Sequence, residues 1–261
     1  GTALADTLTL TTVDGDTITY EFDGGLSGQL DDLTAFQFDG SDGDDLLIVD
    51  ASGGGALLTG GITFNGQGQD STNPGDGLKV IGDSIGDFDD VAIYAPDGST
   101  AGSGVVTLNG IAISFTGLEP VDITGMESVT ISPAGEDDLL TVTNGFDFFD
   151  GGSTVALRVT GSTGGIDIET AALYGNTNVT IDTTSDDGDD TVTITSADNA
   201  HGITDFTINT GAGTDDIQID GDVDNVATTS FSSGGTITFD GGAVNTTGSQ
   251  DYTGAVLLNA N

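Results

Sequence analysis

The chain lacks cysteine and tryptophan and has very few basic residues. Lys79 and Arg158 stand against 43 aspartates and glutamates, and His201 is the single histidine. The absence of cysteine excludes a disulfide framework and a thiolate metal site, and one histidine is too few for a zinc site built from several His or Cys ligands. No apolar run approaches the ~20 residues that a membrane-spanning helix needs, so we expect no membrane insertion.

The acidic excess is the dominant property of the sequence. A formal net charge of -41 cannot be neutralised by internal ion pairs. Nucleic acids are excluded as partners because two cations cannot displace the counterions of a phosphate backbone. Two like charges about 4 Å apart repel by ~1 kcal/mol even in water, so the carboxylates are expected to recruit cations. Ca²⁺, which prefers carboxylate oxygen, is the predicted cofactor.

Residues that could support catalysis are scarce. A Ser/His/Asp site would have to use His201, and the sequence contains no nucleophile elbow beside it. Pairs of acidic residues, which glycosidases use, are numerous, but their positions are explained by turns. Neither Lys79 nor Arg158 lies in a motif that would hold an acidic sugar. We therefore predict no enzyme activity and no catalytic residue.

Short strands separated by tight turns dominate the pattern. Thr, Val, Ile, Asp and Gly are abundant, and no window shows a helical stripe of apolar residues. Alternating apolar and Thr residues bounded by Gly and Asp are typical of brief strands. In four copies such a strand precedes a Gly/Asp turn and a second apolar strand: residues 36–38 with 43–49, 129–131 with 135–140, 179–181 with 188–192, and 206–208 with 213–217.

The spacing of these copies indicates a repeat. Asp190 and Asp216 are 26 residues apart, as are Phe36 and Ile62, and Asp138 precedes Asp190 by 52. A unit of about 26 residues fits these distances, and it predicts a degenerate copy at residues 164–168.

We therefore predict an all-β fold, a parallel β-solenoid (β-helix) with irregular coils of about 26 residues. Tandem antiparallel β-sandwiches, in which strands and turns recur every 8–12 residues, are the alternative. The chain is expected to form one elongated domain over residues 1–261, with a subdivision near residues 120–128 as an option.

The Gly/Asp turns are the candidate metal sites. Stacked coils would bring carboxylates of neighbouring turns within about 5 Å of one another, a spacing that suits Ca²⁺. The predicted ligands are Asp42, Asp44, Asp45, Asp87, Asp89, Asp90, Glu136, Asp137, Asp138, Asp187, Asp189, Asp190, Asp215 and Asp216.

Two of these turns resemble the nonapeptide of hemolysin-type, RTX-like calcium-binding repeats, in which glycines permit a tight turn and Asp binds calcium. Residues 40–48, GSDGDDLLI, match with one Gly replaced by Ser, and residues 210–218, TGAGTDDIQ, match with one Gly replaced by Thr. Such nonapeptides occur in tandem, whereas here each turn is separated from the next by about one coil. The resemblance implies calcium binding by individual stacked turns.

More widely, residues 15–20, 113–121 and 249–261 resemble repeat modules of giant extracellular bacterial surface and matrix proteins. This resemblance implies a secreted or cell-surface structural protein. Because a solenoid exposes strand edges at its ends, we expect self-association end to end into a filament or layer. The alternative is an adhesin or carbohydrate-binding module whose polar loops at 66–77 and 95–104 contact extracellular polysaccharide.

Overall fold

The computed structural model describes residues 1, 4–23, 25–69, 74–83, 90–185, 188–198 and 202–259. Within these ranges the protein is all-β and contains no helix, as the sequence pattern predicts. No helix able to cross a membrane occurs in this part of the chain. The strands of the first half are β1 (Thr7–Asp14), β2 (Thr17–Phe22), β3 (Leu26–Leu30), β4 (Phe36–Asp42), β5 (Leu46–Asp50), β6 (Ile62–Gly68), β7 (Gly77–Ile81), β8 (Val91–Pro96), β9 (Gly104–Leu108), β10 (Ile111–Thr116), β11 (Val121–Thr124) and β12 (Ser128–Ile131).

The second half continues in the same style. Its strands are β13 (Leu139–Phe146), β14 (Val155–Thr163), β15 (Ile166–Asp167), β16 (Ala171–Tyr174), β17 (Asn178–Asp182), β18 (Thr191–Ile194), β19 (Ala197–Asp198), β20 (Asp205–Asn209), β21 (Asp216–Ile219), β22 (Val223–Val226), β23 (Thr228–Phe239), β24 (Val244–Thr246) and β25 (Gln250–Leu258). Twenty-two strands belong to one large mixed sheet, and β19, β22 and β24 form a separate three-stranded sheet.

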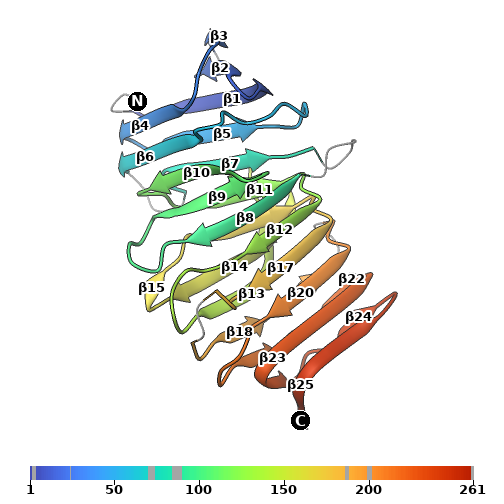
Figure 1. Ribbon diagram of the computed structural model, residues 1–261. Coiled ribbons are helices and arrows are strands. Elements are labelled where there is room, and N and C mark those ends of the chain that lie inside the picture. Colours follow the sequence, from blue (N-terminus) through green and yellow to red (C-terminus); the bar gives the residue numbers. More distant parts are fainter. Residues whose placement is uncertain are drawn as a thin grey trace.

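Parallel, in-register pairing links strands that are far apart in the sequence. One ladder runs β1–β5–β7–β11–β16, and another runs β8–β12–β17–β20–β23–β25. A third connects β13, β18, β21 and the distal parts of β23 and β25. Figure 1 shows these strands stacked from the N-terminal end to the C-terminal end.

Register places like residues above one another. Leu10, Val49, Val80, Ile123 and Leu173 form one row of fully buried side chains along the first ladder. Because alternate side chains point to opposite faces of a strand, this row faces the interior while its neighbours face outward. Each strand thus contributes two or three apolar residues, and the core is long and thin.

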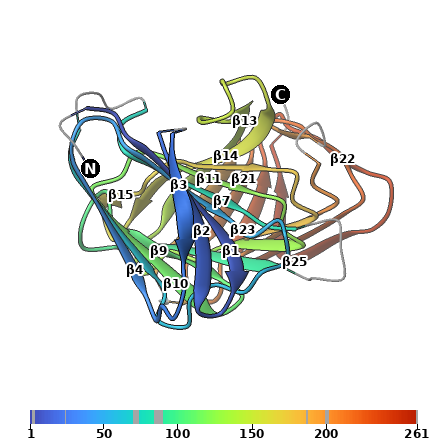
Figure 2. The same ribbon diagram turned by 90° about the horizontal axis from the view of Figure 1, so that it is seen from above.

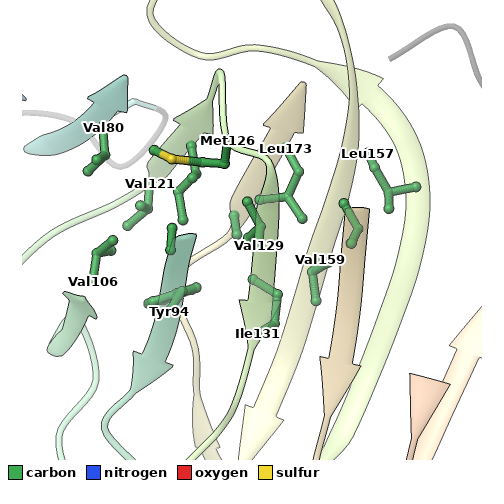
Figure 3. Packing of buried hydrophobic residues seen from close by; sticks show 14 of the residues in the cluster. Val80, Tyr94, Val106, Val121, Met126, Val129, Ile131, Leu157, Val159 and Leu173 are labelled. Atoms are coloured by element: carbon green, nitrogen blue, oxygen red, sulfur yellow. The ribbon is translucent and has the colours of Figure 1, made fainter. Parts of the chain in front are cut away.

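Side chains from strands that are far apart in the sequence fill the interior. Tyr94, Val106, Val129 and Ile131 are fully buried, and Figure 3 shows their side chains gathered between the ribbons. Aromatic residues also stack along the ladders, as in Phe38 and Phe64, whose rings lie 5.1 Å apart in register on β4 and β6.

Antiparallel hairpins interrupt the parallel pattern. The hairpin β2–β3 pairs against β1, β9 links β8 to β10, and β14 pairs with β13 and β16. Figure 2, seen along the stack from the N-terminal end, shows β2 and β3 in front of the remaining strands.

One detail of the predicted repeat is wrong. Residues 164–168 are not a degenerate coil: Gly164 and Gly165, with φ of 55° and 79°, make a tight turn into β15, which pairs antiparallel with β14. The side chain of Asp215 accepts the backbone N–H of Asp190, 25 residues away, one residue less than the spacing of Asp190 and Asp216. The spacing of Asp138 and Asp190 by 52 residues does correspond to a direct contact.

Candidate functional site

Acidic residues that precede equivalent strands stack in two rows, here called the first and second acid rails. The first rail consists of Asp6, Asp45 and Asp76, which directly precede the paired strands β1, β5 and β7. The backbone N–H of Asp6 donates to Oδ1 of Asp45 (2.8 Å), and that of Asp45 donates to Oδ1 of Asp76 (2.7 Å). Each of these two carboxylates therefore satisfies a backbone donor of the neighbouring turn.

The second rail repeats this geometry with Asp138, Asp190 and Asp215, which precede β13, β18 and β21. The N–H of Asp138 donates to Oδ1 of Asp190 (2.8 Å), and the N–H of Asp190 donates to Oδ1 of Asp215 (3.1 Å). All three side chains are buried. Aspartates of neighbouring turns are thus stacked. Each contact, however, joins the carboxylate of one residue to the backbone N–H of the other, and not two carboxylates.

The second carboxylate oxygens differ along the rails, and that of Asp190 is hydrogen-bonded; Oδ2 of Asp215 is buried without a hydrogen-bond partner among the residues described. Oδ2 of Asp190 accepts a hydrogen bond from Oγ1 of Thr183 (2.5 Å). Oδ2 of Asp45 and Oδ2 of Asp76 are buried and have no hydrogen-bond partner among the residues described. Burial raises the pKa of Asp45 and Asp190, and it raises that of Asp76 to about 6.

Glycine makes room for the first rail. A Cβ on Gly40 would lie 2.5 Å from Oδ2 of Asp45, and a Cβ on Gly66 would lie 2.5 Å from Oδ2 of Asp76. Each added Cβ would also clash with a backbone carbonyl oxygen. The Cβ on Gly40 would lie 2.7 Å from the carbonyl oxygen of Gly66, and the Cβ on Gly66 would lie 2.6 Å from that of Gly117. The two carboxylates therefore pack directly on glycine backbone.

The other predicted ligands lie elsewhere. Asp44, Asp137 and Asp189 directly precede rail residues and are partly or fully exposed. Asp42 and Glu136 are exposed, and Asp216 is half-buried. Asp87, Asp89 and Asp187 lie outside the described residues, as does His201.

Asp90 is buried at a separate place, where its carboxylate accepts from Nδ2 of Asn109 (2.6 Å) and from the N–H of Asp83 (2.7 Å). Across the described ranges, no group of three or more His, Cys, Asp or Glu side chains is arranged to hold a metal ion. The predicted ligands therefore meet at most in pairs.

The exposed acids form an outer row beside the second rail. The N–H of Asp189 donates to Oδ1 of Asp137 (2.9 Å), and the N–H of Thr214 donates to Oδ1 of Asp189 (3.0 Å). Asp137 and Asp189 thus occupy equivalent positions in neighbouring turns, with their side chains open to solvent.

Ahead of the two strands that follow the first rail, the residues at the equivalent positions are glutamates, and both line a cavity. The register of β7, β11 and β16 places Glu119 and Glu169 beyond Asp76, and the N–H of Glu119 donates to the carbonyl of Asp76 (2.7 Å). Burial, with a further contribution from the charge of Glu119, raises the pKa of Glu169 to about 7. The cavity, of about 400 Å³, is lined by Gln69, Ala101, Gly102, Gly117, Leu118, Glu119, Pro120, Phe148, Asp167, Ile168, Glu169 and Thr170.

A polar cluster that the sequence did not predict lies on the outer face of β7, β11 and β16. Lys79 and Asp122 are register partners and are buried, although they point away from the core row. Lys79 forms an ion pair with Asp150 of the β13–β14 loop, and Tyr174 donates to Oδ2 of Asp150 (2.9 Å). A charged residue in the middle of an otherwise apolar strand was the available signal, at Lys79 in GLKVI and at Asp122 in VDIT.

No protein-family model, no curated protein and no solved structure matches this chain. The local geometry therefore carries the functional interpretation.

Proposed function

We propose that the chain is a calcium-stabilised structural segment of an extracellular bacterial surface layer or matrix fibre, folded as a β-solenoid that associates end to end. The supporting observation is the in-register parallel pairing of strands one turn apart. Phe36 pairs with Ile62, Asp205 with Thr228 23 residues later, and Asp216 with Thr236 20 residues later. Tandem antiparallel sandwiches would not require such long parallel ladders.

The ends of the stack differ in a way that favours association. β25 pairs with β23 and with no other strand in the described part of the chain. Its exposed side chains include Val256, Leu257 and Leu258. An exposed strand edge is a template for pairing with another strand. We propose that its occupant is a second copy of this chain, whose β4 lies at the opposite end of the stack (Figure 1).

Calcium fits the outer row better than the rails. Asp137 and Asp189 are exposed and belong to neighbouring turns, whereas the rail carboxylates are buried. In the proposal, the carboxylate pair binds Ca²⁺ together with water and carbonyl oxygens, as the ion's six to eight oxygen ligands require. Neutralising such pairs would lower the repulsion of a chain with net charge -41.

Assembly is tested by Leu257→Lys, with Leu139→Lys as the matched control. Both leucines are exposed, at 48% and 57%, but Leu139 lies on β13, which is paired on both sides. Sedimentation and electron microscopy at millimolar Ca²⁺ should show filaments for the wild type and Leu139→Lys and single particles for Leu257→Lys. Single particles for the wild type, or filaments for both variants, would contradict assembly through β25.

A binding module is the second candidate, and the cavity favours it. The two polar loops of the sequence meet there, because Gln69 belongs to one and Ala101 and Gly102 to the other. A volume of about 400 Å³ is in the range of small-ligand sites, and Phe148 with Glu169 offers an apolar face beside a carboxyl group. Glycan-array binding that Glu169→Gln removes, with folding unchanged by circular dichroism, would support a carbohydrate site, whereas no glycan bound by the wild type would contradict it.

A further inference from the structure

The loop between β13 and β14 folds back onto the outer face of the sheet, and one aspartate within the loop fixes its conformation. Oδ2 of Asp147 accepts the N–H groups of Asp150 (2.5 Å) and Gly152 (3.1 Å), and Oδ1 accepts that of Thr154 (2.6 Å). Burial alone would raise the pKa of Asp147, but these donors keep it below its ordinary value. The position of Asp150 is therefore determined by the fold and not by the ion pair alone.

The loop covers the only lysine of the sequence. Lys79 is 7% exposed although it lies on the outward face of β7, and the ring of Phe149 lies so close to Gly77 that any side chain there would clash with it. The side chain of Lys79 is 8% exposed and that of Asp150 is 40% exposed. The amine is thus enclosed, while the carboxyl group that meets it reaches solvent.

A second carboxyl group, that of Asp122, lies beside this ion pair. Asp122 is fully buried on the neighbouring strand, in register with Lys79, and its carboxylate accepts the N–H groups of Phe148 (3.1 Å) and Phe149 (3.2 Å). Oη of Tyr174 lies 2.9 Å from Oδ2 of Asp150 and 3.5 Å from Oδ2 of Asp122, so it connects the two carboxyl groups.

We propose that Lys79 and Asp150 react to form an intramolecular isopeptide bond, with Asp122 transferring the proton. A proton first passes from the ammonium of Lys79 to the carboxylate of Asp150, which gives a neutral amine and a carboxylic acid. Nζ then attacks Cγ of Asp150, and a C–N bond forms. Asp122 accepts a proton from Nζ and returns it to the leaving oxygen, the Cγ–O bond breaks and one water is released. No oxidant or reductant is consumed.

Position and environment both favour this condensation. Holding two reacting groups together supplies an effective molarity of about 10⁵ M or more, and this lowers the entropic part of the barrier to amide formation. The charged amine of Lys79 is enclosed and carries a desolvation cost that a neutral amide avoids. Burial raises the pKa of Asp122 to about 7, so this carboxyl group can both donate and accept a proton near neutrality.

The bond would join β7 to the β13–β14 loop, two segments 71 residues apart. Such a crosslink supports a structural role under load, because it links separate turns of the stack covalently in a chain that has no cysteine.

Trypsin gives a direct test, since Lys79 and Arg158 are the only positions after which it cleaves this sequence. An isopeptide bond blocks cleavage at Lys79. The denatured wild-type protein should therefore yield fragments 1–158 and 159–261, and its intact mass should be one water below that of the sequence. Tandem mass spectrometry should assign the link to Lys79 and Asp150. Cleavage after Lys79 together with an unchanged intact mass would overturn the proposal.

Variants separate this bond from other losses of water. Asp150 precedes Gly151, and formation of a succinimide at this Asp-Gly step would also remove one water. The succinimide could still form in Lys79→Arg, whereas the isopeptide bond could not. We expect the sequence mass for Lys79→Arg and for Asp150→Ala. Asp122→Asn should keep the wild-type circular dichroism spectrum and lose the link. A water loss that persists in Lys79→Arg would refute the bond, and a link that persists in folded Asp122→Asn would refute the role of Asp122.

Discussion

The two acid rails use the same turn for the same backbone contact, and they differ at Asp190. Oδ2 of Asp190 in the second rail accepts the hydroxyl of Thr183, whereas Oδ2 of Asp45 and Asp76 in the first rail, like Oδ2 of Asp215 in the second, is buried without a partner in the described residues. The contact shared by both rails is therefore that of Oδ1 with a backbone N–H, and the cost of the other oxygen is set locally.

Truncation of a rail residue should have the largest effect. Asp190→Ala removes the acceptor for the N–H of Asp138 and for Thr183 Oγ1, and Asp45→Ala removes the acceptor for the N–H of Asp6. Since a buried donor left without a partner costs about 1–3 kcal/mol, we expect both variants to be destabilised and Asp190→Ala to lose more. Urea unfolding monitored by circular dichroism measures the difference, and equal losses would show that the Thr183 contact adds nothing.

Replacing glycine by alanine should lower the melting temperature where the glycine packs on a rail and leave it nearly unchanged where the glycine lies in an open turn. Gly66→Ala places a Cβ against Oδ2 of Asp76 and the carbonyl of Gly117, while Gly53→Ala meets nothing within 4 Å. Overpacking of this kind costs about 1–3 kcal/mol. Thermal melts should show a clear loss for Gly66→Ala and little change for Gly53→Ala; similar melting temperatures would mean that the rail has room to move.

The pH dependence of stability should come partly from Asp76. Its pKa is raised to about 6 in the folded state from an ordinary value of 3.8, so its contribution is fully present below about pH 3.8 and is lost as the pH rises through about 6. Asp76→Asn, which cannot ionise, should flatten the stability curve between pH 4 and pH 7. An unchanged pH profile for Asp76→Asn would contradict the assignment.

Replacing an exposed acid should have the smallest effect on the calcium-free protein. Asp189→Asn retains the oxygen that accepts from Thr214, and an exposed substitution changes stability by about 0.5 kcal/mol or less. The free energy of unfolding in chelator should therefore match that of the wild type, whereas stabilisation by added Ca²⁺ should decrease. A variant that responds to Ca²⁺ as the wild type does would place the ion elsewhere.

Much of the fold could be predicted from the sequence because the same short sequence patterns recur along the chain. Alternating apolar residues bounded by Gly and Asp predict brief strands, and the spacing of Phe36 and Ile62 gives their pairing. The hairpin at Gly164 and Gly165 was missed because its strands have the same apolar pattern as a coil, and pattern alone does not give strand direction.

The candidate site was only partly predictable. Spacing shows that Asp138 and Asp190 stack, but not that a carboxylate would cap an amide, since that depends on the backbone of the adjacent turn. The contact of Lys79 with Asp150 depends on a loop that folds back over the sheet, and no local pattern in the sequence reports its direction.

A calcium-titrated thermal melt of the chain tests the central claim, that stacked carboxylates without protein cations bind ions from solution. Ca²⁺ at about 100 times its dissociation constant should stabilise the protein by ~2.7 kcal/mol for each site, and chelator should reverse the shift. Equal melting temperatures in chelator and in millimolar Ca²⁺ would contradict the claim.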